Sequence, residues 1–152
     1  MSSAYVDGLK MLGRRELSEK QIRQRLARKE HSPEDIDEAV ARLREERAIN
    51  DRRVAEAIAR SETSLRQRGK IRVRMQIERA GIAKETAKAA IDAVFGDIDD
   101  AALLESSLRK RLRGRESIAD QREFQRLFRY LLGQGFESDR VMKALKAYRI
   151  NG

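Results

Sequence analysis

Residues 69–77, GKIRVRMQI, alternate between apolar and polar positions. Ile71, Val73, Met75 and Ile77 are each separated by one arginine or glutamine. Strict alternation of this kind is typical of a half-buried β-strand, and a basic strand would favour a sheet that binds nucleic acid. The apolar pattern of the rest of the chain decides whether this segment is a strand or a helix.

An apolar pattern recurs three times along the chain. In each copy, two apolar residues four positions apart are followed, ten residues later, by three more at spacings of four and three. The positions are Ile22, Leu26, Ile36, Val40 and Leu43, then Val73, Ile77, Ala87, Ile91 and Val94, then Leu127, Leu131, Val141, Leu145 and Tyr148. Spacings of three and four place side chains on one face of a helix. Each copy is therefore predicted to contain two short helices joined by a tight turn.

A further helical stretch precedes each pair of helices. These stretches lie at roughly 4–13, 51–66 and 98–113. The chain is therefore predicted to be all-α, with three tandem three-helix, helix-turn-helix-like repeats in an elongated curved array. The expected repeats are residues 1–49, 50–96 and 97–152. A unit of this size buries too little surface to be stable alone, so neighbouring repeats are expected to complete its core.

Polar residues mark the expected helix starts. Ser18 with Gln21 three positions later fits a capping box, and Ser32 is followed by proline and two acids, which suit the first turn of a helix. Asp97 with Asp100 gives a further possible start. These residues support the boundaries that the apolar pattern predicts.

Two glycines mark expected helix ends. Gly81 and Gly135 stand at corresponding places after the first helix of their pairs, where glycine can adopt a positive φ. The first copy differs, because Glu30 and His31 stand there instead. His31 is expected in a solvent-exposed loop between two helices.

The alternating segment is predicted to be a helix over 70–80. Val73 and Ile77 coincide with core positions of both other copies, while Ile71 and Met75 form a second apolar pair four positions apart on the opposite face. We favour the interpretation that this second pair packs against an adjoining repeat. The alternative is an exposed stripe that binds a partner.

Composition narrows the class of protein. Lys and Arg number 34 against 25 Asp and Glu, giving a net charge of +9 in 152 residues, and cysteine is absent. The positive charge favours a polyanionic partner such as nucleic acid or an acidic protein surface, although a merely solvated surface has the same composition. We expect a soluble cytoplasmic protein without a signal peptide or a membrane span, and a monomer is the simplest oligomeric state.

Sequence motifs give no support to an enzyme. His31 is the only histidine, so neither a histidine-based triad nor a multi-histidine metal site can be assembled. The segment RGKI at 68–71 lacks the upstream glycine and the following Ser or Thr of a phosphate-binding loop. The acidic residues fit solvated helix faces better than a metal site. We therefore expect no catalytic residues, no cofactor and no metal.

Two basic segments are the candidate binding residues. Residues 66–79 hold six basic residues against one acid, and residues 109–115, RKRLRGR, hold five basic residues and no acid. The candidate contacts are Arg66, Arg68, Arg72, Arg74, Arg109, Lys110, Arg111, Arg126 and Arg129. Such clusters can bind nucleic-acid phosphates or the carboxylates of an acidic protein groove, and a solvated face is the third interpretation.

The third copy differs from the other two. It holds Phe124, Phe128, Tyr130, Phe136 and Tyr148, which fit a bulkier core better than a platform for base stacking. Its last helix, expected at 138–149, carries Arg140, Lys143, Lys146 and Arg149. That helix could read DNA as a helix-turn-helix does, whereas the corresponding helix of the first copy begins with acids.

Four segments together resemble the RecX family, the bacterial regulators of the RecA recombinase. They are LGRRELSEKQIRQRL (12–26), AINDRRVAEAIARS (48–61), RGKIRVRMQIERAGI (68–82) and FRYLLGQGFESDRV (128–141). The resemblance runs from about Ala4 to Tyr148. One departure is RAIND (47–51), where the family commonly has Gly-Tyr-Leu-Asp-Asp, and an aromatic residue expected near Val54 is missing.

The resemblance implies tandem three-helix repeats and a regulator that acts on RecA. Such a protein would bind the RecA filament on single-stranded DNA along its helical groove, and would suppress ATP hydrolysis, strand exchange and co-protease activity in DNA repair, recombination and the SOS response. Two alternatives stay open from the residues: a direct DNA-binding protein that uses the basic third repeat, and a helical scaffold for another protein.

Overall fold

The computed structural model describes residues 3–96 and 98–151, and polar side chains cap several of its helices. The Ser18 side chain accepts a hydrogen bond from the Gln21 backbone, and the Gln21 side chain accepts one from the Ser18 backbone. Ser32 caps the next helix by accepting from the Asp35 backbone. Both predicted starts are confirmed. Asp99 caps the helix that begins at Asp100. Asp97, which was predicted to mark this start, lies outside the described residues.

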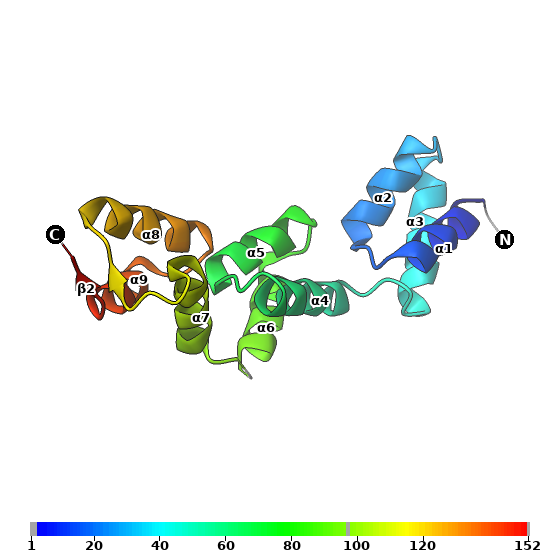
Figure 1. Cartoon of the computed structure of the whole chain (residues 1–152). Helices are drawn as coiled ribbons and strands as arrows, with labels where there is room; N and C mark the ends of the chain where they lie inside the picture. Colours follow the sequence, from blue (N-terminus) through cyan, green and yellow to red (C-terminus); the bar gives the residue numbers. More distant parts are fainter. Residues whose placement is uncertain (1–2, 97, 152) are drawn as a thin grey trace.

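The described residues form nine helices and two short strands. They are α1 (Ser3–Arg14), α2 (Glu19–Arg28), α3 (Pro33–Glu45), α4 (Asp51–Ser64), α5 (Lys70–Arg79), α6 (Lys84–Phe95), α7 (Asp100–Leu112), β1 (Ser117–Ile118), α8 (Gln121–Gly133), α9 (Ser138–Lys146) and β2 (Arg149–Ile150). Figure 1 shows an elongated array with the two termini at opposite ends. The predicted all-α fold is confirmed, although α9 ends before Arg149, which was expected within that helix.

The strands β1 and β2 were not predicted. They pair in parallel, Ser117 with Arg149 and Ile118 with Ile150, and the Asn151 backbone donates to the Ile118 carbonyl at 2.8 Å. Each strand has only two residues, too few for any alternating pattern. The pairing depends instead on the segment after α9 lying beside the segment before α8.

Buried apolar side chains form three clusters, one within α1–α3, one within α4–α6 and one within α7–α9. We call these helix groups the first, second and third units. The recurring apolar positions are all buried except Tyr148, which packs against the third cluster and donates to Glu105 at 2.5 Å. The division at 1–49, 50–96 and 97–152 stays a prediction, and residues 1, 2, 97 and 152 lie outside the described residues.

The alternating segment is a helix, as predicted. Val73 and Ile77 of α5 are fully buried, whereas Ile71 and Met75 stay 48% and 45% exposed. The favoured interpretation, that an adjoining repeat covers this second pair, is wrong. The third unit meets α5 through backbone groups of its first turn, such as the Ile71 amide, and leaves these side chains in contact with solvent.

Neighbouring units are joined in the same way at both junctions. In the first, the Ser18 hydroxyl before α2 donates to the Ala80 carbonyl after α5. In the second, the Gly69 amide before α5 donates to the Gln134 carbonyl after α8 at 2.8 Å. The start of the second helix in one unit thus contacts the end of the second helix in the following unit. This repeated contact places α2, α5 and α8 one after another along the array.

This contact between units explains why a glycine follows the second helix of the second and third units. Gly81 and Gly135 have φ of 82° and 98°, as predicted. A Cβ on Gly81 would lie 2.4 Å from the Lys20 side chain, and one on Gly135 would lie 2.4 Å from the Arg72 backbone. Glu30 occupies the corresponding place in the first unit with φ of 67°.

The junction of the first two units also contains polar contacts near the segment RAIND (47–51). Asn50 caps α4, and the Asp51 side chain accepts from the Glu19 backbone at 2.9 Å. Ile49 is buried, and Arg53 pairs with Glu16 at 3.0 Å. Asp51 and Arg53 therefore contribute contacts between these two units.

His31 differs from its expected exposed position. Its side chain is 12% exposed and lies 2.7 Å from an Asp7 carboxylate oxygen. The end of α2 brings it back against α1, which local sequence does not reveal. Across 3–96 and 98–151, every helix is too short or too polar to cross a bilayer.

Candidate functional site

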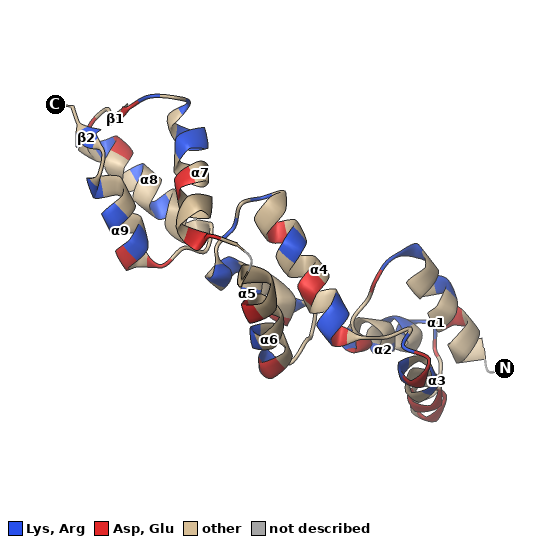
Figure 2. Ribbon diagram, turned by 90° about the horizontal axis from the view of Figure 1, so that it is seen from below, with Lys and Arg blue, Asp and Glu red and all other residues tan. Residues whose placement is uncertain are grey.

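The candidate contact residues fall on the second and third units. Arg66, Arg68, Arg72 and Arg74 lie on α5 or on the turn before it, and the others lie on α7 and α8. Figure 2 shows acidic residues gathered on α3 in the first unit and basic residues along α7, α8 and α9 in the third. The acidic side of the first unit is therefore confined to α3, because Lys10, Arg14, Arg15, Arg25, Arg28 and Lys29 line a basic hollow beside α1 and α2 of the same unit.

Of the four candidate arginines on α5 or the turn before it, two are held by contacts within the protein and two are exposed. Arg68 pairs with Glu62 at 2.8 Å, and both side chains are only 14% exposed. Arg72 donates to the Gly133 carbonyl at 3.0 Å and so helps hold the third unit. Arg66 is exposed, and Arg74 is 57% exposed with a long 3.5 Å contact to Glu78. Arg66 and Arg74 are therefore better placed to meet a partner.

The end of α7 forms a hollow lined by cations. Lys110, Arg111, Arg113 and Arg115 surround a cavity of about 570 Å³. Arg113 takes the left-handed conformation with φ of 54°, which ends α7 and turns the chain. Side chains close in sequence are thereby arranged around one open space. Arg113 and Arg115 were not among the candidate contacts, although both lie in the basic segment 109–115.

Neighbouring groups orient parts of this basic hollow. The Arg111 guanidinium lies 4.2 Å from the centre of the Tyr130 ring on α8, a cation–π distance. Arg115 forms two hydrogen bonds, at 2.8 and 2.6 Å, to Glu123. These bonds hold the pKa of the Glu123 carboxyl at about 2, well below its usual value. Glu123 thus neutralises Arg115, while Lys110 and Arg113 remain exposed.

Arg126 and Arg129 extend the basic surface along α8. Both are exposed, and Arg129 makes only a 3.5 Å contact to the Gln125 carbonyl. Arg109 on α7 is 75% exposed and lies 3.4 Å from Glu105. Exposed, weakly paired arginines can exchange water for phosphate or carboxylate with little loss of existing contacts.

The aromatic residues of the third unit serve mainly its core. Phe136 is buried, and Phe124, Phe128 and Tyr148 pack against the third cluster, as predicted. Arg140, expected on an open recognition face, pairs with Asp100 at 2.8 Å. Lys143 and Lys146 on α9 stay exposed, so the exposed basic groups of this unit lie on α7, the following turn, α8 and α9. This arrangement can bind an extended anionic surface.

Catalytic chemistry gains no support from the geometry of the described residues. Within 3–96 and 98–151, His, Asp and Glu side chains do not converge in groups of three that could hold a metal ion. The strongest pKa shift, that of Glu123, follows from its ion pair with Arg115.

Comparison with known proteins supplies the family context. Residues 4–43 match the family model for the first three-helix domain of RecX. The chain is 31% identical to regulatory protein RecX of Halorhodospira halophila over 91% of its length and 84% of that protein. It is 30% identical to regulatory protein RecX of Chromohalobacter salexigens, covering 91% and 88% of the two chains.

The fold has matching solved structures. The crystal structure of RecX from Lactobacillus salivarius superposes with a TM-score of 0.78 at 18% identity, covering 95% of this chain and 93% of that one. A second crystal structure of a regulatory protein RecX gives a TM-score of 0.75. At such low identity these superpositions establish the shared fold.

Proposed function

Because the chain belongs to the RecX family of regulatory proteins, we propose that it binds the RecA filament on single-stranded DNA and inhibits the recombinase. The array would lie in the helical groove of the filament and suppress ATP hydrolysis, strand exchange and co-protease activity. It would act as a monomer in the cytoplasm, without catalysis of its own, in DNA repair, recombination and the SOS response.

The observation that carries this proposal is the arrangement of exposed cations on consecutive units of an elongated array. Arg66 and Arg74 belong to the second unit, whereas Lys110, Arg126 and Arg129 belong to the third. An elongated row of units can contact several protomers of a filament at once. Linking contacts in this way raises the overall affinity beyond that of any single contact.

Inhibition requires that the protein prefer one state of the filament. A ligand shifts an equilibrium only by its difference in affinity between the two states. An array that spans several protomers fits one spacing of the filament better than another. Binding would therefore favour the filament state that cannot cycle nucleotide.

The test is the ATPase rate of RecA on single-stranded DNA, titrated with this protein at fixed salt. A parallel titration measures its binding to the same DNA without RecA. We expect the rate to fall at protein concentrations well below those that coat bare DNA. A rate that stays constant, or falls only as bare DNA becomes coated, would contradict regulation through the filament.

A second candidate function is direct DNA binding by the third unit. The hollow lined by Lys110, Arg111, Arg113 and Arg115 supports it, because phosphates can bind there without a protein partner. Sequence-selective binding to duplex DNA in the absence of RecA would favour this alternative. The acidic start of α3 argues against contact with DNA along the whole array.

A further inference from the structure

A cleft between α5 and α6 lies outside the basic hollow of the third unit. Its volume is about 460 Å³, and Ile71 of α5 and Ile91 of α6 line it. Ile71 is 48% exposed although it is a large aliphatic residue, whereas Ile91 is 6% exposed and belongs to the core. The cleft therefore offers an apolar surface that is continuous with the core of the second unit.

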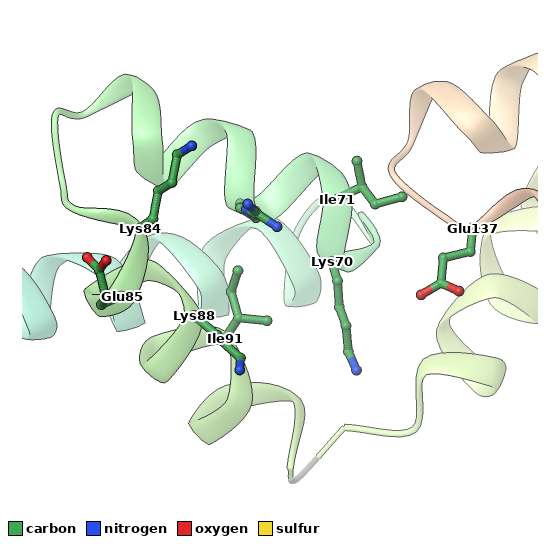
Figure 3. A pocket seen from close by; sticks show the side chains of 8 residues that line it. Lys70, Ile71, Lys84, Glu85, Lys88, Ile91 and Glu137 are labelled. Carbon is green, nitrogen blue, oxygen red and sulfur yellow. The ribbon is translucent and has the colours of Figure 1, made fainter.

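Cations surround this apolar surface. Lys70 comes from α5, and Lys84 and Lys88 come from α6 (Figure 3). Arg74 of α5 lines the cleft as well. The Lys70 ammonium lies 5.5 Å from the centre of the Phe95 ring, which holds it beside the cleft. Lys84 and Lys88 are exposed, and neither forms an ion pair with another residue in the described part of the chain. Their charges are available to a ligand.

Two acids lie at the edges of the cleft. Glu85 is on α6 beside Lys84, and Glu137 reaches toward the cleft from the turn before α9 (Figure 3). A continuous row of phosphates would approach these carboxylates unfavourably. A peptide can place its carboxylates beside the lysines and an apolar side chain over the isoleucines. The chemistry therefore favours a protein ligand over nucleic acid.

We propose that this cleft binds an acidic protein segment that inserts one aromatic or aliphatic side chain between Ile71 and Ile91. The inference deepens the proposed function, since it gives the regulator a docking site for an acidic segment of its partner. The anchor side chain supplies affinity by burying apolar area, and the lysines select acidic sequences. Glu85 and Glu137 limit where along the segment the acids can lie.

The probe is a short fluorescein-labelled peptide of Asp and Glu residues with one central Phe. Two matched peptides replace the Phe by Ser, or the acids by Asn and Gln. Binding to the full chain is followed by fluorescence anisotropy. We expect the complete peptide to bind at least about tenfold more tightly than either matched peptide, since each loses one of the two interactions.

Two variants locate the binding site. K84E/K88E reverses charges on the exposed face of α6, and I71S removes the apolar contact from an exposed position. Each is expected to weaken binding of the complete peptide about tenfold or more. K143E reverses an exposed charge on α9 and is expected to leave the affinity unchanged. Circular dichroism on each variant verifies that the helices remain folded.

The alternative outcomes are distinct. Equal binding of the Ser-containing peptide, or equal loss with K143E, would overturn the proposed cleft. Binding of a thymidine oligonucleotide that K84E/K88E abolishes, without peptide binding, would assign the cleft to nucleic acid and also overturn it. The RecA ATPase titration separates the two proposals: peptide binding without RecA inhibition retains the cleft alone, and inhibition without peptide binding retains the function alone.

Discussion

The Ser18 hydroxyl in the first unit donates a hydrogen bond to the Ala80 carbonyl in the second. Ser18 is fully buried, and the same side chain accepts from the Gln21 amide to cap α2. At the corresponding place of the next junction, the Gly69 amide donates to the Gln134 carbonyl. One residue thus both starts a helix and joins two units.

We predict that Ser18→Ala lowers the free energy of unfolding by about 2–4 kcal/mol, because it removes a cap and leaves a buried carbonyl without its donor. Urea unfolding followed by circular dichroism measures the change. Ser32→Ala is the matched control, since Ser32 caps α3 and is exposed. The control is expected to cost about 1 kcal/mol. Equal losses would show that the junction bond contributes nothing.

Gly135→Ala should destabilise the junction of the second and third units. Gly114→Ala is a matched control, because Gly114 also has a positive φ of 82° but no atom within 4 Å of its would-be Cβ. The control is expected to cost about 1–2 kcal/mol from the left-handed conformation alone. Gly135→Ala adds a clash with the Arg72 backbone, worth at least about 1–3 kcal/mol more. Thermal unfolding of both variants checks the difference.

Acid should weaken the third unit through Glu123. Its pKa is lowered to about 2 by Arg115, whereas the ordinary value is 4.5. The pair's contribution is therefore present above about pH 4.5 and is lost as the pH falls toward 2. Arg115 is 45% exposed, so solvent screening reduces the contribution to the order of 1 kcal/mol.

Glu123→Gln should remove this part of the pH dependence. The variant is less stable than the natural chain at neutral pH, and the difference disappears toward pH 2. Urea unfolding at a series of pH values between these limits measures it. A difference that stays constant down to pH 2 would exclude titration of Glu123 as its cause.

Charge reversal on α8 should weaken binding to the filament. We predict that R126E/R129E raises the protein concentration needed to halve the RecA ATPase rate by about tenfold or more, since two exposed cations become anions. If both contact phosphates, the dependence of log K on log salt becomes shallower by about 2. Arg60→Glu on α4, an exposed position outside the basic clusters, is the control and should leave both quantities unchanged.

Charge reversal on α5 tests the other basic group. R66E/R74E is preferred over changes at Arg72, because Arg72 holds the Gly133 carbonyl and its loss would disturb the junction. The expected result is weaker filament binding and weaker inhibition with an unchanged unfolding transition. Intact binding and inhibition in this variant would remove the α5 arginines from the contact surface.

Local pattern predicted most of the helices. The sequence of α5 alternates, yet Val73 and Ile77 identified it as a helix, because an apolar pair four positions apart recurs in every copy. Both residues are buried. Ser18 and Ser32 marked helix starts by the same local logic. His31 was expected in solvent and Ile71 under a neighbouring unit, and both placements depend on how separate helices meet.

The sequence by itself determined most of the helices, the caps at Ser18 and Ser32, the repetition and the charge, because each follows from side chains a few positions apart. Only the tertiary structure decided which cations are available. It engaged Arg68 with Glu62 and Arg72 with the third unit, and it left Arg66 and Arg74 exposed. It also gathered Ile71, Lys88 and Glu137 around one cleft. The contact of Arg72 and the composition of the cleft depend on segments that are distant along the chain, which the spacing of residues does not encode.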